Sequence, residues 1–357
     1  MRGVVALFIA VFLFVNISVL YISARGEESV GNTLYVGGSG PGNYSSIHNA
    51  IVAASERDTV FVYNGTYYEN VVVNKSVNII GENKETTIID GGGWFGVGYV
   101  FKIMADQVNI SGFTIKNSTN AFGPFDELLH PGDGILIDAN NSIIIENIIT
   151  ENTFGINIEN SFHNKITNNI FIDNGNGIYL TQSSDTIIID NEITADNRNF
   201  AVWDWSNFSY GISMYNSYNN IVTNNTISNI SGIGIQLSYL SENNSIYFNN
   251  FINNSENAND SCINNSWDNG EYGNYWDDYG GIDKNNDGIG DVSYPMPGGY
   301  NQDRYPLMMP YYGIIRTGKF YVDEGSLYRM LIIGMIVAIL FCLPIGYIWY
   351  RKYYKIK

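Results

Sequence analysis

Gly134-Ile-Leu-Ile is the first copy of a pattern that recurs through the middle of the chain. In this pattern, Gly-Ile is followed by a variable residue and then by Ile, Leu or Met. The later copies are Gly155-Ile-Asn-Ile, Gly177-Ile-Tyr-Leu, Gly211-Ile-Ser-Met and Gly234-Ile-Gln-Leu. Successive copies lie 21, 22, 34 and 23 residues apart, and the longest interval contains an insertion at 195–206. Repetition at a nearly fixed period is typical of solenoid architectures.

Each unit contains a second short apolar run and then an asparagine. The asparagines follow their glycines by 13, 14, 14, 14 and 16 positions, at Asn147, Asn169, Asn191, Asn225 and Asn250. The apolar runs alternate with period two and are rich in Ile, which predicts strands, and turn residues separate them. Coils of about 22 residues would stack about 4.8 Å apart. The sequence therefore predicts an all-β fold, a right-handed parallel β-helix with Ile inside and asparagine ladders between coils.

The first coil needs a cap, because the end of a solenoid exposes unpaired strand edges. Segment 44–54 predicts a short amphipathic helix that could cover this end. Its apolar residues share one face and are Ile47, Ala50, Ile51 and Ala54. At the other end, we expect Trp276 and Tyr275 to pack within a C-terminal cap.

Longer stretches resemble a known family. Segment 46–93 resembles the start of many pectin-lyase-like β-helix proteins, and the Gly-Ile units with Asn-Asn-x-Ile resemble the NosD-type β-helix, also called the carbohydrate-binding and sugar-hydrolase (CASH) domain. GNYWDDYGG at 273–281, DGIGD at 287–291 and YPLM at 305–308 are similar to the C-terminal signature of that group. The resemblance covers roughly residues 32–309, and the layout is similar to that of archaeal cell-surface members with one C-terminal span.

Both ends of the chain predict targeting to a membrane. Residues 3–21 are nearly all apolar, follow Arg2 and precede Ala24, which is typical of a secretory signal peptide; an uncleaved signal anchor stays open. The uncharged segment 330–349 is long enough to cross about 30 Å of bilayer hydrocarbon. Four basic residues follow it and place the C-terminus in the cytoplasm: Arg351, Lys352, Lys355 and Lys357.

This gives an expected domain organisation. It comprises a signal peptide or signal anchor at 1–24, an N-terminal cap at 30–60, the β-helix at 61–266, a C-terminal cap with an Asp-rich loop at 267–311, a stalk at 312–328, a transmembrane helix at 330–350 and a cytoplasmic tail at 351–357. We expect a single-pass protein of the cell membrane with most of the chain outside.

The charge of the chain excludes one class of partner. The formal net charge is −17, from 18 Lys and Arg against 35 Asp and Glu. A nucleic-acid-binding protein that neutralises phosphates needs a basic face, so we expect no nucleic acid. The two cysteines, Cys262 and Cys342, provide no disulfide framework, and three scattered histidines with few methionines argue against a copper site.

The Asp-rich loop is a candidate calcium site. Asp283, Asn285, Asp287 and Asp291 fall at positions 1, 3, 5 and 9 of a calcium-binding loop, with the carbonyl of Ile289 at position 7. Position 12 is not the bidentate Glu of an EF-hand. We therefore expect Ca²⁺ at this loop, with an Asx-rich turn that binds nothing as the alternative.

Signatures of catalysis are poor, and we assign no catalytic residue. Two carboxylates from adjacent coils would suffice for glycoside hydrolysis if they lay about 5–9 Å apart. The carboxylates available on the coils are Asp133, Asp138, Glu146, Glu159, Asp173, Asp190 and Glu192. An acidic solenoid would carry such residues without any catalytic role.

Two insertions contain aromatic residues next to carboxylates, the pattern that binds sugar rings and their hydroxyls. The candidate glycan-binding residues are Phe125 and His130 in 121–131, and Trp203, Asp204 and Trp205 in 195–206. The alternative is that these aromatic side chains pack against the wall of the β-helix.

Thirteen Asn-x-Ser/Thr sequons in the expected extracellular part are glycosylation candidates, of which we expect fewer than half to be modified. They begin at Asn43, Asn64, Asn74, Asn109, Asn117, Asn140, Asn207, Asn224, Asn229, Asn243, Asn253, Asn259 and Asn264.

These features predict a membrane-anchored extracellular β-helix that binds glycans without catalysis or forms part of the cell envelope. The expected partners are the membrane, glycans and envelope proteins. One alternative is a polysaccharide lyase or hydrolase. A second, implied by the resemblance to NosD, is an accessory to copper maturation.

Overall fold

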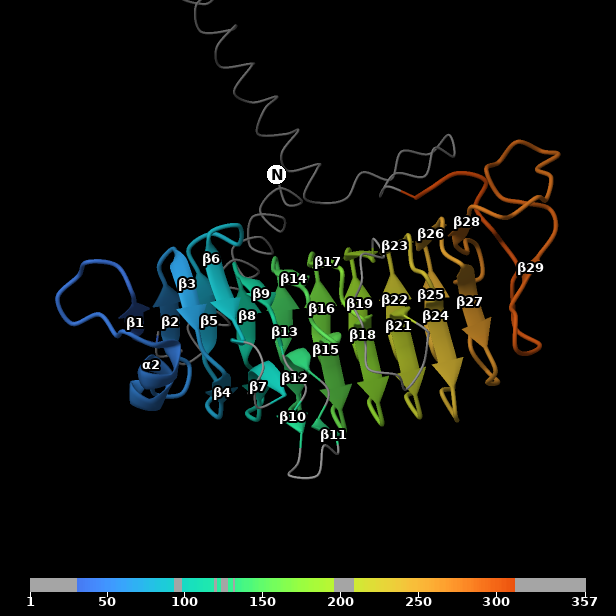
Figure 1. The fold of residues 1–357 in the computed structure, drawn as a ribbon. Coiled ribbons are helices and arrows are strands. Elements are labelled where there is room, and N and C mark those ends of the chain that lie inside the picture. Colours follow the sequence, from blue (N-terminus) through green and yellow to red (C-terminus); the bar gives the residue numbers. More distant parts are fainter. Residues whose placement is uncertain are drawn as a thin grey trace, which may run out of the picture.

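The computed structural model describes residues 31–92, 98–118, 121–122, 128–130, 132–195 and 209–311. Within them the chain winds into a parallel β-helix with three sheets of nine, nine and eight strands, which we name A, B and C. In Figure 1 the coils follow one another from the blue N-terminal end to the orange C-terminal end. The predicted parallel β-helix is confirmed.

Each coil contributes one short strand to each sheet, and every pairing within sheets A, B and C is parallel. Sheet A consists of β1 (Thr33–Val36), β2 (Thr59–Val62), β5 (Asn78–Gly81), β8 (Asn109–Ser111), β13 (Ile143–Ile145), β16 (Lys165–Thr167), β19 (Ile187–Ile189), β22 (Ile221–Thr223) and β25 (Ser245–Tyr247). Sheet B consists of β3 (Gly65–Tyr68), β6 (Thr87–Asp90), β9 (Thr114–Lys116), β14 (Ile148–Thr150), β17 (Ile170–Ile172), β20 (Glu192–Thr194), β23 (Thr226–Ser228), β26 (Asn250–Ile252) and β28 (Tyr275–Trp276). Sheet C consists of β4 (Val71–Val73), β7 (Tyr99–Ile103), β12 (Asp133–Ile137), β15 (Phe154–Glu159), β18 (Asn176–Thr181), β21 (Tyr210–Tyr215), β24 (Ile233–Ser238) and β27 (Glu256–Asp260).

The first Ile of each Gly-Ile unit forms a buried column inside the helix. The strand register places these residues side by side on five successive strands of sheet C, and all are fully buried. They are Ile135, Ile156, Ile178, Ile212 and Ile235. The predicted interior column is confirmed, and burying each side chain stabilises the fold by about 1.5–3 kcal/mol.

An asparagine ladder runs along the corner between sheets A and B. The backbone N–H of Asn147 donates to Oδ1 of Asn169 at 3.0 Å, and that of Asn169 donates to Oδ1 of Asn191 at 3.0 Å. The left-handed backbone lies one residue earlier, for example at Asn168, whose φ is 54°. The chain thus bends immediately before each ladder asparagine.

One predicted member of this ladder was wrong. Asn249, not Asn250, accepts from the backbone N–H of Asn225, because the bend in this coil lies at Phe248. Asn250 instead begins β26, where its side chain exchanges two hydrogen bonds with the backbone of Tyr311. The ladder asparagine of this coil lies 15 residues after Gly234, one more than in the three preceding coils and one fewer than predicted.

The N-terminal end carries the predicted helix, α2 (Ile47–Ala53). Ser46 caps it by accepting from the backbone N–H of Asn49, and Ile47, Ala50 and Ile51 are buried. Strand β1 pairs with β2, so a strand of sheet A lies within the segment expected to form the cap.

At the other end, two buried tryptophans donate to two buried carboxylates. Trp267 donates to Asp260 at 2.8 Å, and Trp276 donates to Asp303 at 2.9 Å. The antiparallel pair of β29 (Tyr294–Pro295) and β30 (Gln302–Asp303) lies in the same region. Trp276 is buried at this end, stacked on Phe251 and Tyr294, but it lies on β28, the last strand of sheet B. Tyr275 beside it is half-buried.

None of the described residues forms a helix long and apolar enough to cross a membrane. The expected signal segment 1–24, the stalk 312–328, the transmembrane helix 330–350 and the tail lie outside the residues that the structure describes.

Candidate functional site

The outer faces of sheets A and B mix aliphatic side chains with polar ones, such as Ser111 and Tyr247 on sheet A and Thr114 and Thr226 on sheet B. Aliphatic side chains alternate with the buried ones on β13, β19 and β22 of sheet A, and on β14 and β17 of sheet B. On sheet C the corresponding outward position holds amide, hydroxyl and phenol groups from β15 to β27. These five residues, which we call the polar row, are Asn157, Tyr179, Ser213, Gln236 and Asn259. Tyr179, Gln236 and Asn259 are half-buried, whereas Asn157 and Ser213 are buried.

The polar row follows directly from the repeat. Its members from β15 to β24 occupy the variable position between Ile and the next apolar residue of each Gly-Ile unit. Because strand side chains alternate between two faces, a residue between two buried ones must point outward. The variable position was therefore a signal for this face that sequence reasoning missed.

Asn157 holds two of the predicted carboxylates close together at one end of the row. Its Nδ2 donates to Oε1 of Glu159 at 2.9 Å and lies 3.5 Å from Oδ2 of Asp133. Asp133 is fully buried, and this burial raises its pKa well above the ordinary value; Glu159 raises it further, whereas Asn157 and Lys102 lower it. A raised pKa keeps a carboxyl group protonated at a pH where others are charged.

The other carboxylates considered above do not join this pair. Asp138 is exposed, and Glu192 begins β20 on sheet B. Glu146, Asp173 and Asp190 occupy left-handed corner positions with φ of 57°, 51° and 58°.

Both insertions leave the stack at the corner between sheets B and C. One connects β9 to β12 and the other connects β20 to β21, so they border β15 and β18, which carry Asn157 and Tyr179. Four of the candidate glycan-binding residues, Phe125, Trp203, Asp204 and Trp205, lie outside the described residues. The backbone of His130 ends β11 (Leu128–His130), which pairs antiparallel with β10 (Ala121–Phe122).

The Asp-rich loop forms a network of turns. Asp283 accepts from the backbone N–H of Gly288 at 2.9 Å, and Asp287 accepts from that of Ile289 at 2.9 Å. The side chain of Asn285 donates to Asp287 at 2.9 Å, while Asp291 accepts from the backbone N–H of Lys284.

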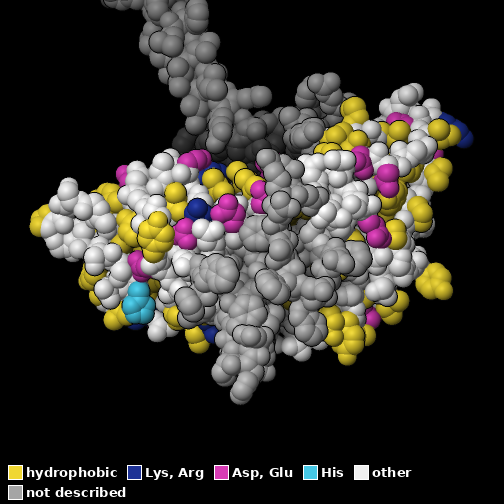
Figure 2. Space-filling view, viewed as in Figure 1, with side chains coloured by type: hydrophobic (Ala, Val, Ile, Leu, Met, Phe, Trp, Pro, Cys, Tyr) yellow, Lys and Arg dark blue, Asp and Glu magenta, His cyan; other side chains and the backbone are white. Residues whose placement is uncertain are grey.

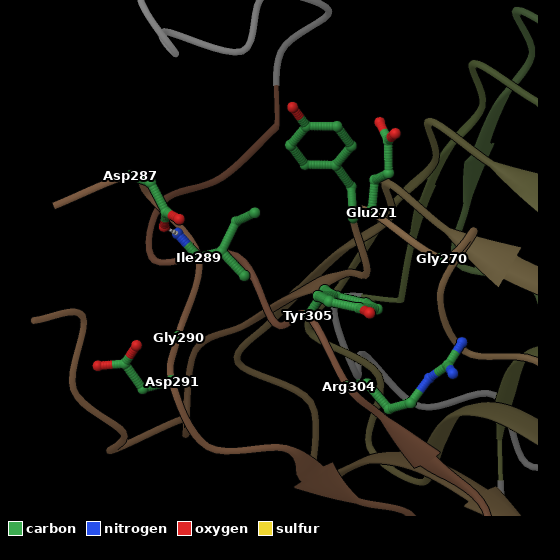
Figure 3. Close-up of a pocket in the computed structure, with 9 residues that line it drawn as sticks. Gly270, Glu271, Asp287, Ile289, Gly290, Asp291, Arg304 and Tyr305 are labelled. Atoms are coloured by element: carbon green, nitrogen blue, oxygen red, sulfur yellow. Dashed lines mark hydrogen bonds between the residues drawn. The ribbon is translucent and has the colours of Figure 1, made fainter. Parts of the chain in front are cut away.

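An open groove of about 520 Å³ lies beside this loop. Figure 3 shows Asp287 turned toward Ile289, with Asp291 on the other side of the loop and Arg304 pointing away from both. Arg304 makes a bidentate ion pair with Asp268, at 2.9 and 2.6 Å. Within the described ranges, no three His, Cys, Asp or Glu side chains are grouped closely enough to hold a metal ion.

The sequon asparagines of the described residues all reach the surface. Asn64, Asn74, Asn229, Asn243, Asn253 and Asn264 are exposed, whereas Asn43, Asn109, Asn117, Asn140, Asn224 and Asn259 are half-buried. Asn207 lies outside the description.

Comparison with known proteins gives the family. Residues 47–281, well over half of the chain, match the family described as "Periplasmic copper-binding protein (NosD)". The chain belongs to the NosD family. A curated relative is the "Probable ABC transporter binding protein NosD" of Stutzerimonas stutzeri, which is 40% identical over 82 residues. That match covers 23% of this chain and only 19% of the relative.

Solved structures with similar folds include several β-helix proteins. The complex of XylC with xylose is 12% identical with a TM-score of 0.48, and the match covers 75% of this chain and 68% of the other. Pectate lyase Pel9A is 14% identical with a TM-score of 0.38, over 68% of this chain and 81% of the other. The Dettilon tailspike protein is 16% identical with a TM-score of 0.46, over 66% of this chain and 46% of the other.

The described residues do not fit a copper site of the kind that the NosD family name implies. His48 lies on α2 at one end of the stack, His163 lies at a corner between β15 and β16, and Cys262 follows β27. Cys262 is buried, and burial raises the pKa of its thiol, which disfavours the thiolate that binds metals. These three donors belong to different parts of the described fold and do not converge.

Proposed function

We propose that this member of the NosD family is an extracytoplasmic β-helix that binds carbohydrate along the outer face of sheet C without breaking it. The observation that carries the proposal is the polar row, because amide, hydroxyl and phenol groups are the groups that hydrogen-bond and stack on sugars. A rigid stack of strands holds the half-exposed members of the row, Tyr179, Gln236 and Asn259, at fixed spacings, so more than one sugar unit could be contacted.

Location outside the cytoplasm forms part of the same proposal. It is supported by the family description and by the predicted signal segment and uncharged C-terminal span. We propose that the chain is anchored by that span, with glycans attached at some of the exposed sequons.

A glycan-array screen of the full-length protein in detergent tests the proposal, with release of products from the bound glycans measured in parallel by mass spectrometry. We expect retention of at least one class of glycan with no new products. Absence of binding to every glycan on an array that covers the main envelope polysaccharides would contradict it.

Glycoside hydrolysis is a second candidate, favoured by the contact of Asp133 and Glu159 with one amide nitrogen. Both carboxylate oxygens contact Nδ2 of Asn157, so the distance between them cannot exceed the sum of the two contact distances, 3.5 and 2.9 Å. This limit is compatible with the carboxyl separation of about 5–5.5 Å in retaining glycosidases. The raised pKa of Asp133 suits a general acid, but its complete burial keeps the carboxyl group from contact with a substrate and argues against catalysis. Under hydrolysis, Glu159→Gln would abolish product release and leave glycan binding intact.

Calcium binding at the Asp-rich loop is a separate proposal. It is supported by the side-chain oxygens of Asp283, Asn285 and Asp287, all of which turn into the loop and accept from its backbone N–H groups. A bound cation would relieve the repulsion between the carboxylates of Asp283 and Asp287 and stabilise the C-terminal cap.

A further inference from the structure

Two exposed tyrosines from neighbouring coils form a stacked pair. The ring centroids of Tyr215 and Tyr239 are 4.7 Å apart and the ring planes differ by 4°. The side chains remain 38% and 60% exposed, so the stacked rings present aromatic surface to solvent. Within a protein such rings normally pack inward, and an exposed stacked pair is a surface on which another flat apolar group can pack.

The backbone at this pair is held in an unfavourable conformation. Tyr239 and Leu240 both have left-handed φ angles, 46° and 59°, and Leu240 is 61% exposed. Bulky residues rarely adopt this region, and two in succession persist only where the surrounding structure enforces them. Here the strained turn directs large apolar side chains toward water instead of the core.

The pair lies beside the polar row. Tyr215 lies two residues after Ser213 on the same outer face of β21, and the register places it between Thr181 and Ser238. Gln236 precedes the turn that carries Tyr239. Side chains that hydrogen-bond hydroxyl groups therefore lie next to an aromatic surface on which an apolar face can pack. A pyranose ring carries both hydroxyl groups and an apolar face.

The coils that carry this surface and those next to them are acidic. The described residues between 132 and 262 include twelve Asp and Glu and a single Lys or Arg, Lys165, which lies on sheet A. In Figure 2 the charged side chains that lie over the strands from β18 to β27 are acidic ones. Such a field repels polyanions and leaves uncharged ligands unaffected.

We propose that Tyr215 and Tyr239 form a stacking subsite for the apolar face of a pyranose ring in an uncharged oligosaccharide, and that the excess negative charge of these coils disfavours polyuronates. The proposal rests on the proposed function and specifies where the ring stacks and which class of glycan is selected.

The experiment measures binding of neutral hexasaccharides, with cellohexaose, xylohexaose and mannohexaose as probes, and of hexagalacturonate to the full-length protein by isothermal titration calorimetry. We expect Tyr239→Ala to weaken binding of the best neutral probe by about tenfold or more, and Tyr239→Phe to preserve it. Tyr68→Ala is the matched control, because Tyr68 is an exposed tyrosine on β3 of sheet B and its loss should change nothing. Hexagalacturonate should bind more weakly than the neutral probes, and the difference should shrink as salt screens the carboxylates.

Each contrary result has a distinct meaning. If the wild-type protein binds a neutral probe and Tyr239→Ala binds it equally well, the stacking subsite is wrong and the proposed function stands. Preferential binding of hexagalacturonate would overturn the assignment of an uncharged ligand. If neither these probes nor any glycan of the array binds the wild-type protein, the proposed function fails together with this inference.

Discussion

The backbone N–H of Asn191 donates to the side-chain Oδ1 of Asn225 at 2.9 Å, one coil farther along the stack. The Nδ2 of Asn191 donates to the same atom at 3.0 Å and also to the carbonyls of Ile166 and Ile189. Every polar atom of this buried amide that can donate is therefore paired, and the ladder joins successive coils independently of the strands.

Replacement of Asn191 by Ala should destabilise the fold by about 2–3 kcal/mol, because it leaves the buried backbone N–H of Asn169 without its acceptor and removes the side-chain ladder bond to Asn225. Denaturant unfolding monitored by circular dichroism would measure the loss. Asn74→Ala, at an exposed asparagine, is the control and should change the free energy of unfolding by less than about 0.5 kcal/mol. Equal effects of the two substitutions would show that the ladder contributes nothing specific.

Ile156→Asp should cost several kcal/mol, about 4 or more, since it places an unpaired charge in the fully buried column. Ile187 is the matched control, because it is an isoleucine at an outward, 36% exposed position on sheet A. Ile187→Asp should melt close to the parent protein. A parental melting temperature for Ile156→Asp would mean that the register is wrong.

The C-terminal cap should lose stability as the pH rises through the pKa of Asp303. Burial is the main cause that raises this pKa from 3.8 to about 6, against hydrogen bonds from Asn274, Trp276 and Tyr305 that lower it. Because the folded pKa exceeds the unfolded one, the protonated form contributes stability that is present below about pH 4 and lost by about pH 6, of the order of 3 kcal/mol.

Asp303→Asn should remove this part of the pH dependence, which can be measured by chemical unfolding at pH 4 and pH 6.5 in the presence of a chelator. Asp138→Asn, at an exposed carboxylate, should retain it. An unchanged slope in Asp303→Asn would show that another group titrates.

Millimolar calcium should raise the melting temperature of the protein relative to chelator, because an ion that binds only the folded loop stabilises the fold by mass action. Asp287→Ala should remove most of the difference, and Asp138→Ala should leave it intact. The same melting temperature in calcium and in chelator would show that the Asp-rich loop binds no calcium and forms only turns.

The sequence predicted the fold well because Gly134 and its repeats encode the inward face directly. Ile156 and Ile212 lie where the period-two alternation placed them. The ladder was misplaced only at Asn250, where adjacent asparagines made the corner ambiguous and the conformation of Phe248 decided it.

The candidate site could not be predicted as readily. Tyr179 and Asn157 lie 22 residues apart, and only the register of β15 and β18 shows that they are neighbours. Tyr215 and Tyr239 come together across a strained turn for which no motif is known to us. The pairing of Asp133 with Glu159 likewise depends on the coil-to-coil spacing and not on any local pattern.

The central claim is that the polar row binds carbohydrate, and a tyrosine comparison between two sheets tests it most directly. Tyr179 lies in the row on sheet C, whereas Tyr247 is an outward tyrosine of similar burial on β25 of sheet A. Isothermal titration calorimetry with the best glycan from the array would compare Tyr179→Ala and Tyr247→Ala in the full-length protein. We predict at least about a tenfold loss of affinity for Tyr179→Ala and wild-type affinity for Tyr247→Ala; wild-type affinity in Tyr179→Ala, or loss confined to Tyr247→Ala, would contradict the account.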